Sequence, residues 1–426
     1  MTTCEQLVSE LQRTQSPRLL AVLVRIFGVH NFDLAEDVLQ EAFFKALLHW
    51  KTNGIPSNPQ AWLMQTAKNQ ALDFIRQSRT QLNYAQDLTL FLESEWTTNS
   101  TLDSEFTEHR IKDDQLRMLF MCCHQHLSSE NRLPFMLKHL CGLSISAISN
   151  ALFIPEATLK KRLLRSRKKL HDYQFTLPNE NELPHALNNV HTALYLLFNE
   201  GFHASAKEIL EKGIFCRDAM GLVDLLIDEK SVANQDTFAL LALMHFQMAR
   251  LESKNDQHGQ PIPIDLQDRS NWNKSLIFKG SALLDLASKI TVLGTGRFYI
   301  EAQIAQQHCL ANSFSQTPWS HIYHLYQCLF ELTASPVTQL NLAVAQGYSG
   351  ELDLAIKLVG QLCEDPVFKH SHLPLATLAH LNAMQGNEKQ AWRLADQATE
   401  KGGDKHEHKI MRTQIQRLLV TSVKLD

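Results

Sequence analysis

Apolar residues recur at intervals of three and four positions along most of this chain, and alternating runs of β-branched residues are almost absent. The first spacing keeps apolar side chains on one face of an α-helix, whereas strict alternation is typical of a half-buried β-strand. The pattern therefore predicts an all-α protein. It is clearest in residues 143–170, which contain two short amphipathic segments with the apolar residues Ile148, Ala151 and Leu152, then Leu159, Leu163, Leu164 and Leu170. Two such helices bury their apolar faces by packing on each other.

Breaks in the helical pattern divide the 426 residues into four parts. A first helical unit is expected over 1–79, followed over 80–109 by a polar, acidic linker with the helix-poor core Thr-Thr-Asn-Ser-Thr. A second helical unit is expected over 110–172. A polar segment bounded by prolines ends it, and a long helical extension is expected over 185–426.

The extension contains a faint internal repeat. Its two copies align Ala343, Gly350, Ala355 and Leu358 with Ala379, Gly386, Ala391 and Leu394. Small residues where paired helices touch, with a glycine at the turn between them, resemble tetratricopeptide helical hairpins. The alternative is an ordinary helical bundle with recurring glycine turns.

The formal net charge of -4 does not suggest a nucleic-acid-binding protein, but the charges are unevenly distributed. The second segment of 143–170 carries a run of cations without an offsetting acid: Lys160, Lys161, Arg162, Arg165, Arg167, Lys168 and Lys169. A helix this basic repels itself unless an anion lies alongside, and the major groove of DNA accepts a helix of this width. We therefore expect its first turn, with Glu156 and Thr158, near base edges and the later cations near phosphates. The alternative is a solvated, charged helix end.

Two further amphipathic segments lie upstream. In residues 32–50 the apolar face is expected to carry Leu34, Val38, Phe44 and Leu48, and another face Asp37, Gln40 and Glu41. Residues 61–76 place Trp62, Lys68 and Arg76 along one helix. Opening a duplex costs a few kcal/mol for each unstacked base, which aromatic stacking and phosphate contacts can return. The alternatives are a core role for Trp62 and a solvated face at Asp37 and Glu41.

These two segments and the basic helix together resemble regions 2 and 4 of sigma factors of the sigma-70 family, extracytoplasmic-function (ECF) type. The resemblance implies binding to the RNA polymerase core, on the β′ clamp helices and the β flap. It implies that Asp37, Gln40 and Glu41 dock on the clamp helices. It implies contact with the minus-ten DNA, including the melted non-template strand, through Trp62, Lys68, Asn69, Asp73 and Arg76. It implies contact with double-stranded minus-thirty-five DNA through Glu156, Thr158, Lys160, Lys161, Arg162, Arg165, Arg167 and Lys168.

Phe153 and Ala157 stand where region 4 usually has glycines, and this departure resembles a subgroup with a C-terminal tetratricopeptide-like (TPR-like) extension. The segment around Arg269 looks like the same subgroup. The resemblance implies that residues 185–426 regulate the factor and that the acidic linker threads through the polymerase. The alternative function is a helix-turn-helix transcriptional regulator with a TPR-like sensory domain, which would leave the acidic face of residues 32–50 unexplained.

A cysteine- and histidine-rich stretch raises the question of a metal site. Its residues are Cys122, Cys123, His124 and His126, with His139 and Cys141 nearby. Adjacent cysteines point poorly toward one zinc ion, so we expect buried thiols and no metal. Without a catalytic cluster or a phosphate-binding loop, we expect no enzyme, cofactor or small-molecule substrate. The chain has no apolar run of ~18–20 residues and no secretory signal, and its dispersed cysteines predict a cytoplasmic protein that does not enter a membrane.

Overall fold

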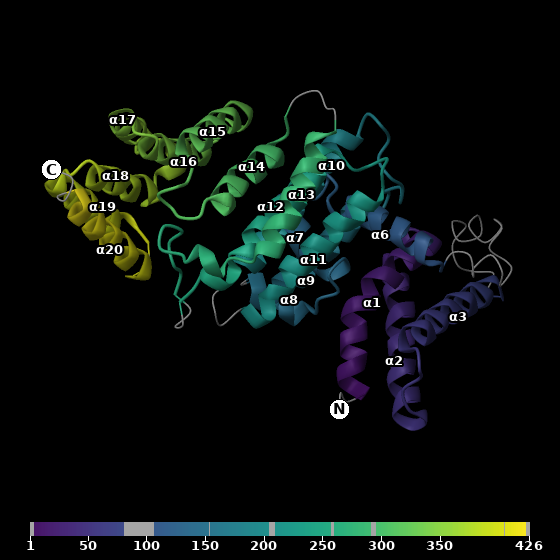
Figure 1. Cartoon of the computed structure of the whole chain (residues 1–426). Helices are drawn as coiled ribbons and strands as arrows, with labels where there is room; N and C mark the ends of the chain where they lie inside the picture. Colours follow the sequence, from purple (N-terminus) through teal and green to yellow (C-terminus); the bar gives the residue numbers. More distant parts are fainter. Residues whose placement is uncertain are drawn as a thin grey trace. The chain divides into compact units, whose positions relative to one another are not determined.

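The computed structural model shows a helical protein (Figure 1). It describes residues 4–80, 106–152, 154–203, 209–256, 260–290, 295–403 and 405–422. Within these ranges every regular element is a helix, and one isolated antiparallel bridge joins Asn255 to Pro261. The prediction of an all-α protein is confirmed. The chain forms two compact units: Met1–Ala204 with Glu208–Val232, and Ser205–Lys207 with Ala233–Asp426.

The first unit is built around its first helix. Its helices are α1 (Cys4–Phe27), α2 (Phe32–Asn53), α3 (Pro59–Thr80), α6 (Glu108–Cys122), α7 (Ser129–His139), α8 (Ile145–Leu152), α9 (Glu156–Leu170), α10 (Leu183–Phe202) and α11 (Ile209–Asp228). In α1 the continuous apolar run from Leu19 to Val24 is buried, because α2 and α3 pack on this helix and so does α6. A helix that is apolar on every side is typical of burial from more than one side.

Glycines end the first two long helices. Gly28 has φ 83° and Gly54 has φ 82°, a backbone region that L side chains rarely adopt. The Gly28 amide donates to the Val24 carbonyl at 2.8 Å, and the Gly54 amide donates to the Trp50 carbonyl at 3.1 Å. These bonds satisfy carbonyl groups that the helix ends would otherwise leave free, and they set the turns between α1, α2 and α3.

The helix-turn-helix predicted at 143–170 is α8 followed by α9. The Ser144 hydroxyl accepts from the Ala147 amide at 3.0 Å, and the Ser149 hydroxyl donates to the Ile154 carbonyl at 2.6 Å. Ile148, Ala151, Leu159, Leu163 and Leu170 are buried as expected, whereas Leu152 is half-buried and Leu164 is 50% exposed. The turn position Phe153 lies outside the described residues.

The second unit contains the predicted repeat. Its helices are α12 (Gln235–Ala249), α13 (Lys274–Ser288), α14 (Arg297–Leu310), α15 (Trp319–Thr333), α16 (Pro336–Tyr348), α17 (Leu352–Leu362), α18 (Leu373–Met384), α19 (Glu388–Lys401) and α20 (Lys405–Ser422). The two copies are the hairpins α16–α17 and α18–α19, and the four repeated alanines Ala343, Ala355, Ala379 and Ala391 are all fully buried.

The two hairpin turns are built alike. Gly350 and Gly386 adopt positive φ values of 106° and 81°. In the first turn the Glu351 amide donates to the Gln346 carbonyl at 3.1 Å, and in the second the Asn387 amide makes the equivalent bond to Asn382 at 2.9 Å. Equivalent caps and equivalent alanines favour a true structural repeat over an irregular bundle.

The first compact unit runs past residue 185, where the sequence pattern placed the start of the extension. Helices α10 and α11 pack on α6, α7 and α8. Arg132 on α7 donates to the Asn189 side chain at 3.0 Å, and Lys112 on α6 pairs with Asp228 at 2.7 Å. The first hairpin of the extension is therefore part of the same unit as the two upstream helical modules.

This arrangement predicts different outcomes for two truncations. Removal of 233–426 is expected to leave the first unit folded, whereas removal of 185–426 also deletes the buried residues Val190, Leu194 and Phe198. Each such side chain contributes about 1.5–3 kcal/mol when buried. The 1–184 chain should therefore have a Tm at least about 10 °C lower than that of the 1–232 chain. Thermal denaturation followed by circular dichroism measures the difference. Equal Tm values would show that α10 and α11 contribute nothing to this unit.

Candidate nucleic-acid interface

Helix α9 separates its apolar anchors from its cations. Leu159, Leu163 and Leu170 are buried where α9 packs on α7 and α8. The opposite side is exposed and carries Glu156, Thr158, Lys160, Lys161, Arg165, Lys168 and Lys169. Lys160 lies 3.8 Å from Glu156 one turn earlier, and the remaining cations of this side point to solvent as a basic surface. A surface of this kind is suited to nucleic-acid phosphates.

Two of the predicted DNA-contacting cations are engaged elsewhere, which is a correction to the expectation for α9. Arg162 is half-buried, 3.9 Å from Glu130 of α7. Arg167 turns away from the basic surface toward α2, where it pairs with Asp33 and, at 2.6 Å, with Glu36. Because its guanidinium group is held by two carboxylates, Arg167 cannot contact a DNA phosphate in this arrangement.

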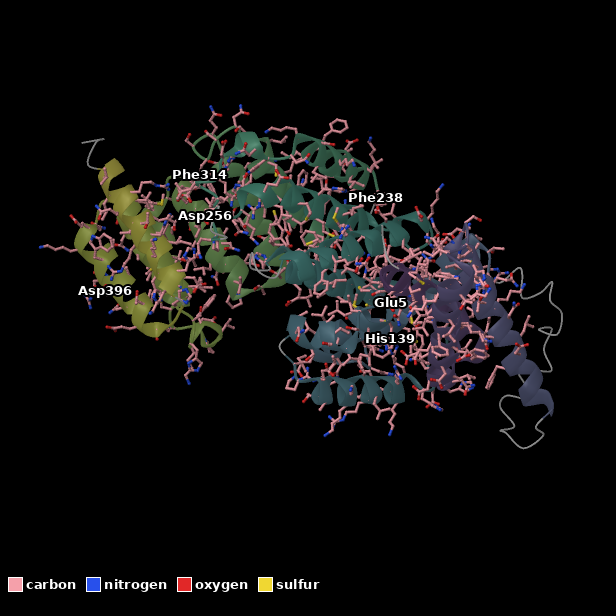
Figure 2. The ribbon with its side chains drawn as sticks, turned by 90° about the horizontal axis from the view of Figure 1, so that it is seen from below. Glu5, His139, Phe238, Asp256, Phe314 and Asp396 are labelled. Atoms are coloured by element: carbon pink, nitrogen blue, oxygen red, sulfur yellow. The ribbon has the colours of Figure 1, made fainter. Side chains whose placement is uncertain are left out.

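His139, the last residue of α7, lies close to Glu36 of this ion pair. Figure 2 labels His139 among the side chains of the first unit. Its ring is 1% exposed and packs edge-on against Phe32 and Phe135, with centroid separations of 4.7 and 4.4 Å. Its Nδ1 atom lies 3.6 Å from a Glu36 carboxylate oxygen. Burial, followed by the nearby charges of Arg167 and Lys138, holds the pKa of His139 well below its ordinary value. The imidazole is therefore neutral.

Helix α2 exposes an acidic stripe that continues into apolar residues. Asp37, Gln40 and Glu41 are exposed, as the sequence pattern indicated. Phe44 and Leu48 were expected on the buried face, but the structure exposes them to 55% and 53%. The buried face instead follows Ala35, Ala42 and Ala46, which allow neighbouring helices to approach closely, together with Phe43 and Trp50. The stripe Asp37, Gln40, Glu41, Phe44 and Leu48, called the α2 stripe below, therefore lies on one exposed face.

Helix α3 presents part of the predicted minus-ten set. Trp62 is half-buried, with centroid separations of 5.4 Å to Trp50 and 5.2 Å to His49. Asn69 and Asp73 are exposed, and Asn69 accepts a hydrogen bond from Gln65 at 3.0 Å.

Lys68 corrects the expectation for α3, because only 6% of it is exposed and its ammonium group is not available to DNA in this structure. The Arg76 side chain and the linker acids Glu93, Glu95, Asp103 and Glu105 lie outside the described residues.

Comparisons with known proteins agree with this arrangement. Family models for sigma-70 region 2 and sigma-70 region 4 match residues 11–81 and 117–170, and a model for a family of unknown function (DUF6596) matches residues 186–288. The uncharacterized protein R00370 of Rhizobium meliloti (strain 1021) is 31% identical over 351 residues, which cover 82% of this chain and 81% of that protein. The ECF RNA polymerase sigma factor SigM of Bacillus subtilis (strain 168) is 27% identical over 139 residues, covering 32% of this chain and 77% of SigM. The chain belongs to the extracytoplasmic-function group of the sigma-70 family.

A further relative extends the comparison. The probable RNA polymerase sigma factor of Haemophilus influenzae is 25% identical over 176 residues, covering 38% of this chain and 87% of that protein. No solved structure matches the chain. The sigma factor thus combines regions 2 and 4, which serve transcription initiation, with a C-terminal helical extension.

Asp114 of α6 is an important polar group that was not among the predicted site residues. It is fully buried and accepts hydrogen bonds from Arg25 of α1 at 2.8 Å and from Arg117 at 2.7 Å. Burial raises the pKa of its carboxyl group, and the Arg25 guanidinium partly offsets this effect. The burial of Asp114 could have been predicted from the helical repeat, because Asp114 shares the buried face of α6 with Ile111 and Met118.

The cysteine cluster packs as a set of apolar groups. Cys122, Cys123 and Cys141 are buried free thiols, and burial raises the pKa of Cys123 to about 12. The Cys123 sulfur lies 3.6 Å from the Met136 sulfur. In the part of the chain that the structure describes, no group of histidine, cysteine and acidic side chains is arranged to hold a metal ion. Every helix in those ranges is also too short or too polar to span a lipid bilayer.

The neutral His139 predicts a pH dependence of stability. In the unfolded chain, histidine binds a proton below its ordinary pKa of 6.5, whereas buried His139 does not, so its contribution is full above pH 6.5 and is lost as pH falls. Between pH 7.5 and 5.5 the loss should reach about 1.4 kcal/mol. Urea denaturation of the 1–232 chain should show a weaker pH dependence for H139F than for the unmodified protein. The buried groups His191 and Asp218 are shared by both proteins and cancel in this comparison. Identical pH profiles would contradict the buried, neutral assignment.

Proposed function

We propose that this sigma factor docks on the β′ clamp helices of RNA polymerase through the α2 stripe. The observation that carries the proposal is the exposure of Phe44 and Leu48 directly beyond Asp37, Gln40 and Glu41. Large apolar side chains at the centre of an interface, with polar groups around them, are typical of binding hot spots. A regulator that binds DNA alone would leave this stripe without a role.

We also propose that α3 engages the minus-ten element and its melted non-template strand. Exposed Asn69 and Asp73, half-buried Trp62 and the following Arg76 support this role. A partly exposed indole can stack on an extruded base, and polar side chains can bind its edge. Lys68 is buried, so we assign it to support of the helix and not to direct contact with DNA.

For the minus-thirty-five element we propose that the basic surface of α9 enters the major groove. Glu156 and Thr158 lie in the first turn and are exposed, which suits contact with base edges. Lys160, Lys161, Arg165 and Lys168 then face the phosphates, and Arg162 can join them after release from Glu130. Region 4 is also proposed to contact the β flap.

The factor acts by binding and not by catalysis in this proposal, and it works in the cytoplasm, where its polymerase is found. The extension is proposed to regulate it, since α10 and α11 pack against region 4. The second candidate function, a helix-turn-helix regulator with a sensory domain, shares only the basic surface of α9.

Replacement of both Phe44 and Leu48 by alanine should weaken binding to core polymerase by at least about tenfold. Each side chain would otherwise bury apolar area worth more than about 1 kcal/mol at the interface. Fluorescence titration of labelled sigma factor with core polymerase measures the affinity. F278A is a matched control, because Phe278 of α13 is 74% exposed and lies outside the sigma regions. Unchanged affinity of the F44A/L48A protein would contradict the docking surface.

The basic surface predicts a salt dependence. Each phosphate contact adds about 0.9 to the slope of log K against log salt concentration. Holoenzyme carrying K160A, R165A and K168A should therefore show a slope about 2–3 smaller in magnitude on promoter DNA than the unmodified holoenzyme. K289A, a cation of the second unit, serves as control. An unchanged slope would place these side chains away from the phosphates.

A further inference from the structure

We propose that the second unit binds an alkylated ammonium compound in a pocket walled by Phe314, Trp319 and Tyr348, with Glu407 as the charged partner. The pocket has a volume of about 390 Å³ and is lined by residues of α16, α18 and α20. A pocket of this size is within the range that takes small organic molecules. The inference goes beyond the proposed function, because it assigns a ligand to the extension and does not depend on how the sigma regions bind polymerase or DNA.

Three aromatic side chains form one wall of the pocket. Trp319, at the start of α15, stacks on Tyr348, at the end of α16, with ring centroids 4.5 Å apart and planes 19° from parallel. Phe314 packs edge-on against both rings, with centroid separations of 5.2 Å. All three side chains are half-buried, so they retain surface that a ligand can cover. The faces of such rings attract cations, and clusters of them recognise alkylated ammonium groups.

Tyr348 and His380 are both uncharged near neutral pH. The Tyr348 hydroxyl lies 2.7 Å from the Nε2 atom of His380, so the two groups share a hydrogen bond. Burial lowers the pKa of His380 to about 4 and raises the pKa of Tyr348 to about 12. The hydrogen bond fixes the Tyr348 ring within the wall, and the charge of the pocket is left to its carboxylates.

The charge of the pocket favours a cation over an anion. The described residues that line it include Asp265 and Glu407 but no lysine or arginine. The Asp265 carboxylate is occupied, because Arg417 pairs with it and Gln414 donates to it at 3.1 Å. The Glu407 side chain is 54% exposed and lies 3.9 Å from His372. Glu407 is therefore the carboxylate on the solvent side of the pocket that can face a bound positive charge.

The same wall favours an alkylated ammonium group over a primary one. A primary ammonium group has three N–H donors, and burying them without acceptors costs free energy. The aromatic rings offer no lone pairs for these donors, and the Tyr348 hydroxyl and His380 already bond to each other. A quaternary ammonium group has no N–H donor to satisfy. Its methyl groups also add apolar surface that can be buried beside Met411 and Ile415 of α20.

The test is isothermal titration calorimetry of the full chain at pH 8, where an ordinary histidine is neutral. Four probes that share one benzyl or phenyl ring are compared: benzyltrimethylammonium, benzylamine, benzyl alcohol and benzoate. Benzyltrimethylammonium should bind at least about tenfold more tightly than benzyl alcohol and also more tightly than benzylamine. Benzoate should not compete with it. The comparison with benzyl alcohol measures the effect of charge, and the comparison with benzylamine measures the effect of alkylation.

Two variants locate the bound cation. E407Q removes the carboxylate charge, and E388Q is its matched control, because Glu388 lies in the first turn of α19 as Glu407 lies in that of α20. W319L removes the indole ring, and W392L is its control, because Trp392 is also half-buried but does not line the pocket. Binding of benzyltrimethylammonium should weaken about threefold in E407Q and about tenfold in W319L, and it should be unchanged in both controls.

Three results would overturn the site. The first is the absence of benzyltrimethylammonium binding at concentrations up to about 10 mM. The second is binding of any of the other three probes as tightly as benzyltrimethylammonium, because charge or alkylation would then not be recognised. The third is full affinity in E407Q and W319L, which would place the cation elsewhere. Circular dichroism checks that each variant is folded, and if W319L does not fold, E407Q against E388Q decides alone.

Discussion

Burial of the apolar run of α1 is the constraint on which the first compact unit depends. The segment Leu19–Val24 is covered by α2 and α3 of region 2 and by α6, so one helix serves two modules. Asp114 and Arg25 meet within this interface, where a buried charge is tolerable only because it is paired and hydrogen-bonded. Apolar packing holds α1 and α6 together, and the buried Arg25–Asp114 pair fixes how the two helices align.

The surface of the first compact unit carries charges of opposite sign in different places. The net charge of -4 conceals a basic helix, α9, and an acidic stripe on α2. Helices α9 and α2 are joined where Arg167 pairs with Asp33 and Glu36, which precede the stripe on α2. The same complementarity that would bring α9 to DNA therefore also brings it to region 2.

Much of the fold could be predicted because local patterns determined it. Apolar residues that recur every three and four positions predicted the helices. The basic run identified α9, and the repeated alanines and glycines located the hairpins α16–α17 and α18–α19. The contacts between distant segments could not be predicted, since Arg167 with Glu36, or Arg25 with Asp114, are set by tertiary packing. Hydropathy also misplaced Phe44 and Leu48, because in α2 the closest packing is made by alanines and not by the largest apolar residues.

The measurement that tests the central claim most directly is transcription in vitro by core polymerase supplemented with the purified full chain, on fragments of genomic DNA. The account predicts discrete transcripts from a small set of start sites, each preceded by shared minus-ten and minus-thirty-five sequences, and none from core polymerase alone. Binding of the chain to duplex DNA without association with polymerase, and without any new transcript, would contradict it.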